Sequence, residues 1–265
     1  MSTVTVTPTV EPSTGPSDPP RVRLDVTDTG TPAVTSTTVV RLGPDGRTVP
    51  VRTDDGGPLA LSGAAGLLYD YEAPFGVAVT YSTQESPTVV SAAVTVNEPD
   101  VWLIHPGVPE ISTPIELRIG SLDEEEWAAP QAVHWPIGRE RPIVHTDGAR
   151  KAPSSSLTVA VESADDLARL RNVLFDSSTL LLNIPAGLGL GVDTDYIAVG
   201  SVTNARPSSI GSDPLRAVRL PFQVVDRPVG GSQAERTWAD VVVDNATWAD
   251  VTARYSTWLD LLAGP

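Results

Sequence analysis

Apolar and polar residues alternate with a period of two along much of the chain from residue 21 onward. The clearest runs place apolar side chains at Val22, Leu24 and Val26, at Val77, Val79 and Tyr81, and at Val90, Ala92, Val94 and Val96. This alternation is typical of half-buried strands, and the breaks at 43–46, 54–57 and 73–76 contain turn-forming residues. Residues 21–98 are therefore predicted to form an immunoglobulin-like or fibronectin-like β-sandwich.

Tyrosines stand near one expected corner of this sandwich. Tyr69 and Tyr71 precede the strand that ends near Tyr81, so one of them can supply the corner tyrosine that such sandwiches use. A plain aromatic core strand explains the same residues equally well.

A second set of alternating segments, over residues 99–228, predicts a further β-rich domain built as a barrel or a sandwich. Its apolar positions include Leu157, Val159 and Val161, then Leu180, Leu182 and Ile184, then Val218, Leu220, Phe222 and Val224. Residues 163–175 instead have helical spacing, with Ser163 as N-cap and an apolar face made by Leu167, Leu170, Val173 and Leu174. We expect this helix to cover one side of the second domain.

Both ends of the chain differ in composition from the two predicted domains. Residues 1–20 are rich in Thr, Pro and Ser, which favours an extended arm without a core of its own. Residues 229–265 contain a ten-residue repeat, with Thr-Trp-Ala-Asp starting at 237 and 247 and Thr-Trp-Leu-Asp at 257. In each repeat the Thr can cap a helix while the Asp bonds back to it. The pattern predicts a C-terminal arm of short helices that presents Trp238, Trp248 and Trp258 to a partner.

The net charge of the chain and its lack of cysteine limit the kinds of partner and chemistry that it can have. Its 18 basic and 33 acidic residues give a formal net charge of −15 at pH 7, which disfavours binding to nucleic acid. The absence of cysteine excludes disulfides, thiolate metal sites and cysteine nucleophiles. We expect neither an export signal nor a membrane-spanning segment, because no stretch has the composition that either requires.

Motifs for catalysis and cofactor binding are lacking in the sequence. His105, His134 and His145 are scattered without metal-ligand spacing, and no G-x-S-x-G nucleophile elbow occurs. The glycines at 187, 189 and 191 do not match a dinucleotide-binding loop. We therefore predict a protein that is not an enzyme and needs no cofactor.

Three groups of charged residues are candidate binding or interaction sites. Asp193 and Asp195 are spaced like cation ligands, but a solvated turn is preferred because no calcium-loop pattern follows. Asp123, Glu124, Glu125 and Glu126 form the densest acidic run, and Arg139, Arg141, Arg150 and Lys151 form the main basic cluster. The acidic run is also compatible with a cation site, a patch for a basic partner or half of a glycosidase pair, but a solvated loop is the default interpretation because consecutive carboxylates point in different directions. If copies of the chain meet through the second domain, contacts between these oppositely charged loops would set their register.

Several segments taken together resemble minor tail proteins of siphophages that infect actinobacteria. The resemblance rests on 22–26, 41–52, 69–81, 142–150, 196–200 and the repeated Thr-Trp-Ala-Asp endings. It implies a distal-tail protein, in which a β-rich domain forms a ring of identical copies between the tail tube and the tail-tip proteins. It also implies a location in the virion tail tip, after synthesis in the host cytoplasm, and no catalysis.

Two other functions remain as alternatives. A minor tail protein that recognises its receptor would bind a host cell-surface glycan through the first sandwich, although residues 21–98 contain no tryptophan. A secreted actinobacterial cell-wall hydrolase is the third hypothesis, suggested by the Pro/Thr-rich start and the β-sandwich. It lacks a paired-carboxylate motif.

Overall fold

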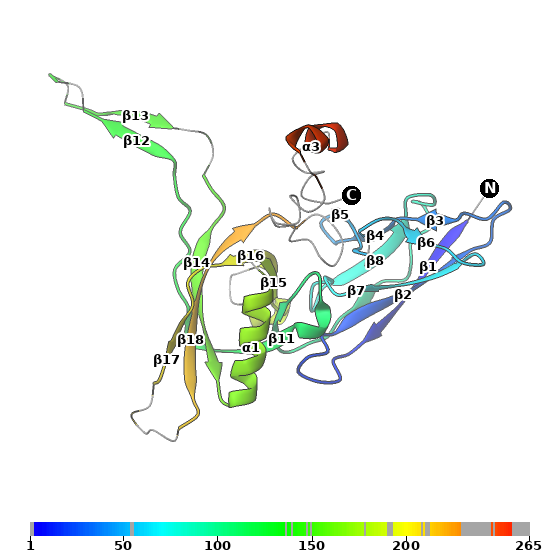
Figure 1. Ribbon diagram of the computed structural model, residues 1–265, viewed down its shortest axis with the longest axis horizontal. Coiled ribbons are helices and arrows are strands. Elements are labelled where there is room, and N and C mark those ends of the chain that lie inside the picture. The colour runs from blue at the N-terminus through cyan, green and yellow to red at the C-terminus, as the bar shows by residue number, and fades with distance from the viewer. Residues whose placement is uncertain are drawn as a thin grey trace.

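The chain is mainly β and is arranged in two β-rich parts. The computed structural model describes residues 3–53, 56–135, 137–138, 140–146, 148, 150–177, 179–189, 193–207, 209, 213–228, 245 and 247–255. Figure 1 shows the N-terminal strands on one side, a second group of strands with a helix beside them, and a hairpin that projects away from both. The expectation of a mainly β protein is confirmed.

The N-terminal part, here called the sandwich, contains two main sheets around one core. One sheet has the order β1-β2-β7 and the other β5-β4-β8-β9, with a short pair β3-β6 beside them. The strands are β1 Val4–Glu11, β2 Arg21–Asp28, β3 Ser36–Thr37, β4 Val39–Leu42, β5 Thr48–Pro50, β6 Leu59–Ala60, β7 Ala65–Asp70, β8 Ala78–Thr83 and β9 Val94–Thr95. Apolar side chains from both sheets, among them Leu24, Val79 and Tyr81, form a single buried cluster. The alternating positions in β2 and β8 therefore point inward as predicted.

The prediction of an extended arm over residues 1–20 is wrong. Val4–Glu11 is a strand that pairs with β2 along its whole length, from Val4 opposite Asp28 to Glu11 opposite Arg21. Val4 and Val6 are buried in the sandwich core. The Pro and Thr content is tolerated because β1 lies at the edge of its sheet, where a proline such as Pro8 disturbs the ladder least.

The second part, here called the barrel, is closed by strands alone. Six strands follow the order β14-β11-β10-β15-β16-β18, and pairing of β14 with β18 closes the ring, while β17 pairs with β18 outside it. The strands are β10 Val101–Ile104, β11 Thr113–Leu122, β14 Ser154–Val161, β15 Thr179–Asn183, β16 Asp195–Val199, β17 Thr203–Ala205 and β18 Arg216–Val225. Of the two expected architectures, barrel or sandwich, the structure has the barrel.

The helix predicted over 163–175 is confirmed as α1 Ala164–Asp176. The Ser163 hydroxyl caps it by accepting a hydrogen bond of 3.0 Å from the Asp166 backbone N–H. Leu170 and Val173 are buried in the barrel core, and Leu167 and Leu174 pack partly buried against it. The helix therefore covers one side of the barrel with the face that the spacing indicated.

The sandwich and the barrel share buried side chains where they meet. Trp102, Ile104 and Leu181 belong to barrel strands but pack in the sandwich core. The Asn183 side chain donates to the Ala73 carbonyl at 3.0 Å and accepts from the Phe75 N–H at 3.3 Å. The boundary expected near 98/99 therefore separates two sheet systems but not two independent cores.

The remaining elements are short. Two 3-10 helices, η1 Pro109–Ile111 and η2 Ala186–Leu188, connect barrel strands. Strands β12 Gln131–His134 and β13 Ile143–Thr146 form the projecting hairpin, and α3 Trp248–Arg254 lies near the C-terminus. Within the part of the chain that the structure describes, no helix is long and apolar enough to span a membrane.

The burial of β1 predicts a difference between two neighbouring positions. Replacing the buried Val4 by Ala removes two methyl groups from the core and should lower the free energy of unfolding by about 2 kcal/mol. Replacing the exposed Thr7 by Ala should change it by less than about 0.5 kcal/mol. Urea unfolding of the two variants measures the difference. If both substitutions change the free energy of unfolding equally and negligibly, residues 1–20 form the extended arm that the sequence predicted.

Candidate functional site

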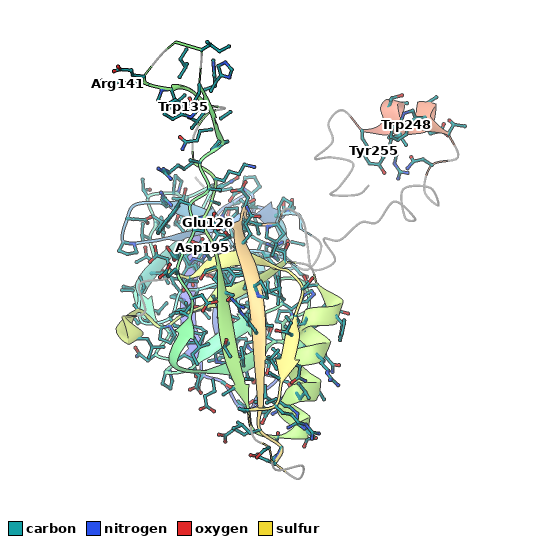
Figure 2. All side chains as sticks on the ribbon, turned by 90° about the vertical axis from the view of Figure 1, so that its left-hand side faces the viewer. Glu126, Trp135, Arg141, Asp195, Trp248 and Tyr255 are labelled. Atoms are coloured by element: carbon teal, nitrogen blue, oxygen red, sulfur yellow. The ribbon has the colours of Figure 1, made fainter. Side chains whose placement is uncertain are left out.

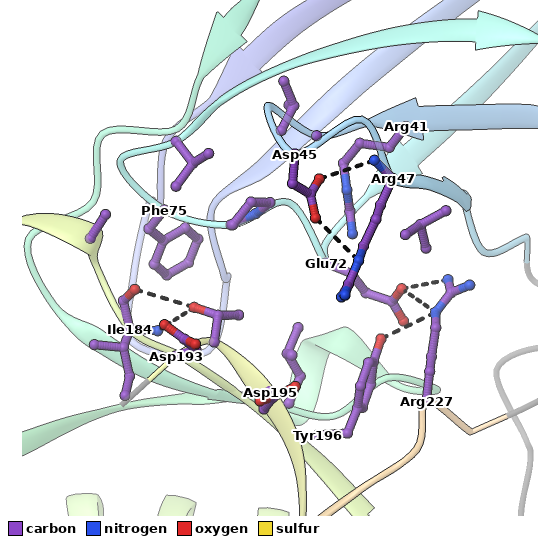
Figure 3. Close-up of a pocket in the computed structure, with 18 of the residues that line it drawn as sticks. Arg41, Asp45, Arg47, Glu72, Phe75, Ile184, Asp193, Asp195, Tyr196 and Arg227 are labelled. Carbon is purple, nitrogen blue, oxygen red and sulfur yellow. Dashed lines mark hydrogen bonds and ion pairs between the residues drawn. The ribbon is translucent and has the colours of Figure 1, made fainter. Parts of the chain in front are cut away.

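A cleft of about 820 Å³ lies where the sandwich meets the barrel. Its walls come from both parts: Arg41, Asp45, Arg47 and Phe75 from the sandwich, and Asp193, Tyr196 and Arg227 from the barrel. Figure 3 shows these side chains around the opening. The cleft is one candidate site, because residues distant in sequence converge there.

One wall of the cleft is formed by the buried carboxylate of Glu72, which joins the two parts. Glu72 accepts hydrogen bonds of 2.9 Å from Nε of Arg52 in the sandwich and 2.9 Å from Nε of Arg227 in the barrel. Nε of Arg227 also donates to the Tyr196 hydroxyl at 3.3 Å. Burial disfavours the Glu72 anion, but Arg227 and Arg52 outweigh it and lower its pKa below the ordinary value of 4.5. The cluster acts as an ionic clamp between sandwich and barrel.

Arg41, which also lines the cleft, forms a second ion pair, with the buried Asp70. Nη1 of Arg41 donates to both oxygens of Asp70, at 2.8 and 2.7 Å, and the Tyr81 hydroxyl donates to Asp70 at 3.0 Å. Burial and the Asp70 charge together raise the pKa of Tyr81. These bonds saturate the Arg41 guanidinium on one side, so its role at the cleft is structural.

Asp193 and Asp195, weighed as cation ligands, lie at the cleft edge. Burial and the neighbouring Asp193 charge raise the pKa of Asp195. Among the described residues no group of three or more His, Cys, Asp or Glu side chains is placed to hold a metal ion. The arrangement is that of the predicted turn leading into β16, with Thr194 bonded to the Ile184 N–H and to Asn183.

The acidic run and the basic cluster lie on the same structural feature, the hairpin and its base. Asp123 is bound by Ser156 and Arg219, whose hydrogen bonds lower its pKa. Glu124 and Glu126 are exposed, and Glu125 is partly exposed. Arg141 is exposed near the outer end of the hairpin (Figure 2). Arg150 and Lys151 are exposed at its base, where Nη1 of Arg150 donates to the Trp127 carbonyl at 3.1 Å. Arg139 lies outside the described residues.

Of the three tryptophans expected to anchor the C-terminal arm, the structure describes one, Trp248. Trp238 and Trp258 lie outside the described residues, whereas Trp248 begins α3 and is exposed. The predicted cap is confirmed in this repeat: the Thr247 hydroxyl accepts from the Asp250 N–H at 3.3 Å, and the Asp250 carboxylate accepts from the Thr247 N–H at 2.9 Å. Val251 and Tyr255 form a small hydrophobic cluster apart from the two larger cores.

Trp127 and Trp135 are not among the interaction residues predicted from the sequence, yet both are exposed in the structure. Trp135 directly follows the last residue of β12, His134, and Figure 2 shows it with Arg141 at the outer end of the hairpin. The available signal was the alternation of Gln131 to Trp135, a glycine at 138 and a second short apolar run at 143 and 144. That signal predicts a hairpin, but not that the hairpin leaves the body of the protein.

Comparison with known proteins adds no relative: no protein-family model matches the sequence, and no curated protein is significantly similar to it.

The ionic clamp predicts a pH-dependent stability. Replacing the buried Glu72 by Gln leaves two partly buried arginines without their anion and should lower the free energy of unfolding by about 3 kcal/mol near pH 7. Because the pKa of Glu72 is lowered in the folded state, its stabilisation is complete above the unfolded value of 4.5 and disappears as the pH falls through the folded value. The gap between wild type and Glu72→Gln should therefore shrink below pH 4.5.

Denaturant unfolding from pH 7 down to pH 3 measures this gap. The exposed Glu110→Gln is the matched control and should follow wild type closely throughout. A gap that is constant with pH would show that the carboxylate charge of Glu72 does not hold the two parts together.

Proposed function

We propose that the protein is a non-catalytic structural component of a siphophage tail tip, a distal-tail-like adaptor that forms a ring of identical copies. The ring would connect the tail tube to the tail-tip proteins and would be built by the barrel. The sandwich, of immunoglobulin-like or fibronectin-like type, would face outward. The sequence resemblance described above suggests this role, and the two-part β architecture is compatible with it.

The single observation that carries the proposal is the projecting hairpin. It exposes Trp135, Ile137 and Val144 to solvent, although large contiguous apolar patches are uncommon on proteins that act alone. A barrel with a projecting hairpin that exposes apolar side chains is suited to a protein that assembles with others. The strongly acidic balance of the chain, −15, again disfavours nucleic acid as the partner.

Glycan recognition by the sandwich is less well supported. Tyr69 and Tyr71 are adjacent aromatic rings, 6.2 Å apart, and would be the natural stacking surface for a sugar. However, the Arg21 guanidinium lies over both rings, at 4.9 and 5.6 Å from their centroids. A sugar would have to displace this cation, and the loss of the cation–π contacts would oppose binding.

The C-terminal residues from 229 onward form, in this proposal, an arm that binds a neighbouring tail protein. Among the described residues, the last in sequence to join a larger core are Tyr196 in the sandwich and Val224 in the barrel, both before residue 229. Short helices such as α3 gain little stability alone, so a partner surface would complete them.

A chain truncated after Val229 tests the arm. The truncated protein should unfold with the same midpoint as the full chain, because both cores and the Arg227 side of the clamp remain. It should fail to enter tails when it replaces the wild-type protein during phage assembly. Immunoblotting of purified virions measures incorporation. A truncated protein that enters tails normally would refute the arm, and one that does not fold would refute its separation from the domains.

A further inference from the structure

The hairpin formed by residues 127–153 projects from the barrel and is here called the arm; it is distinct from the C-terminal arm. Strands β12 and β13 pair from Gln131 opposite Thr146 to His134 opposite Ile143. Its base is tied together by hydrogen bonds of 2.8 Å from the Glu126 N–H to the Ser154 carbonyl and 3.0 Å from the Lys151 N–H to the Ala128 carbonyl. Figures 1 and 2 show that its outer end lies away from both the sandwich and the barrel. A lone two-stranded ribbon is marginally stable in water, so a partner surface would stabilise it.

The arm displays apolar side chains that a partner would cover. The exposed fractions are 51% for Val133, 63% for Trp135, 106% for Ile137 and 51% for Val144. These residues come from both strands and from the turn between them. Tryptophan is a favoured anchor of protein interfaces, because its large ring buries much area at low entropic cost.

The charge of the arm identifies the kind of partner. Residues 131–152 contain four basic and two acidic residues, which leaves 14 basic and 31 acidic residues for the rest of the chain. Arg141 and Lys151 are exposed, and no ion pair between described residues includes them. Arg150 and Lys151 lie at the base of the arm, so Arg141 near the outer end (Figure 2) is the cation that the acidic body of a second copy would attract.

A matching acceptor lies at the base of the arm. Asp123, Glu124, Glu125 and Glu126, here called the acidic loop, line a hollow of about 720 Å³ together with Trp127 and Arg150. Arg219 and Ser156 hold Asp123, which fixes the loop to the barrel. No ion pair between described residues includes the three glutamates, and Trp127 is 51% exposed. An indole beside carboxylates complements an arm whose Trp135 lies beside Arg141 (Figure 2).

We infer that the arm of one copy docks on the acidic loop of the next copy, with Trp135 and Ile137 against Trp127 and with Arg141 against the glutamates. The inference rests on the proposed function and names the contact that would build its ring. Figure 2 shows Trp135 and Arg141 at the opposite end of the arm from Glu126, so a chain does not cover its own loop. Because donor and acceptor surfaces differ, the contact is head to tail, the type that generates a ring when the rotation between successive copies closes and an open filament when it does not.

Engineered thiols test the contact directly, because the natural chain has no cysteine. Ile137→Cys and Glu125→Cys should each stay uncrosslinked when oxidised alone. A mixture of the two variants should give a disulfide-linked dimer, and the double variant a ladder of multimers on a non-reducing gel. Ile137→Cys mixed with Asp165→Cys is the control, since Asp165 is an exposed acid on α1, away from the acidic loop, and should give no dimer.

Two results would overturn the docking contact. Dimers of Ile137→Cys alone would mean that arms pair with arms. Wild-type rings seen by native mass spectrometry, without any crosslink between positions 137 and 125, would place the ring contact elsewhere and leave the proposed function intact. The proposed function fails by a separate measurement, the absence of the wild-type protein from purified tails.

Charge reversal provides a second, independent readout. Arg141→Glu should weaken self-association at least about tenfold, because it places an anion against the glutamates of the next copy. Adding Glu125→Arg should restore most of the loss, which a merely destabilised variant would not show. Sedimentation at several protein concentrations measures both. Unchanged association of Arg141→Glu would contradict the contact.

Discussion

The buried carboxylate of Glu72 is the interaction on which the arrangement of the molecule depends. A carboxylate this deeply buried is stable only with cationic partners, and here one arginine comes from the sandwich and the other from the barrel. The clamp, together with Trp102 and Ile104 in the sandwich core, joins the two parts at their junction. The cleft beside the clamp follows from this geometry (Figure 3).

Closure of the barrel gives the arm a firm origin. The arm is inserted between β11 and β14, two strands that pair with each other across an irregular register between Leu117 and Leu122. Such an irregularity bends a strand and turns its end out of the sheet. Since β14 also pairs along its length with β18, the returning strand is held on both sides. The base of the arm is therefore part of the closed barrel.

Charge and shape in the proposed assembly support each other. In the proposed assembly, the acidic body would keep isolated copies apart in solution, while Arg141 would direct the arm of one copy to the acidic loop of another. The apolar residues of the arm would then supply affinity by leaving water. In the cleft, by contrast, the partly buried Arg41 and Arg227 are already paired with Asp70 and Glu72, so these cations are not available to a second copy.

The sequence by itself determined the local features of this protein. Period-two alternation located β2 and β8, helical spacing with Ser163 located α1, and Thr247 with Asp250 located the cap of α3, because pattern period and capping act over a few residues. Only the tertiary structure decided the rest. Composition pointed to an arm over residues 1–20, yet pairing with a distant strand buried Val4. Barrel closure, the clamp on Glu72 and the direction of the hairpin likewise depend on residues up to 155 positions apart, a separation that no local pattern encodes.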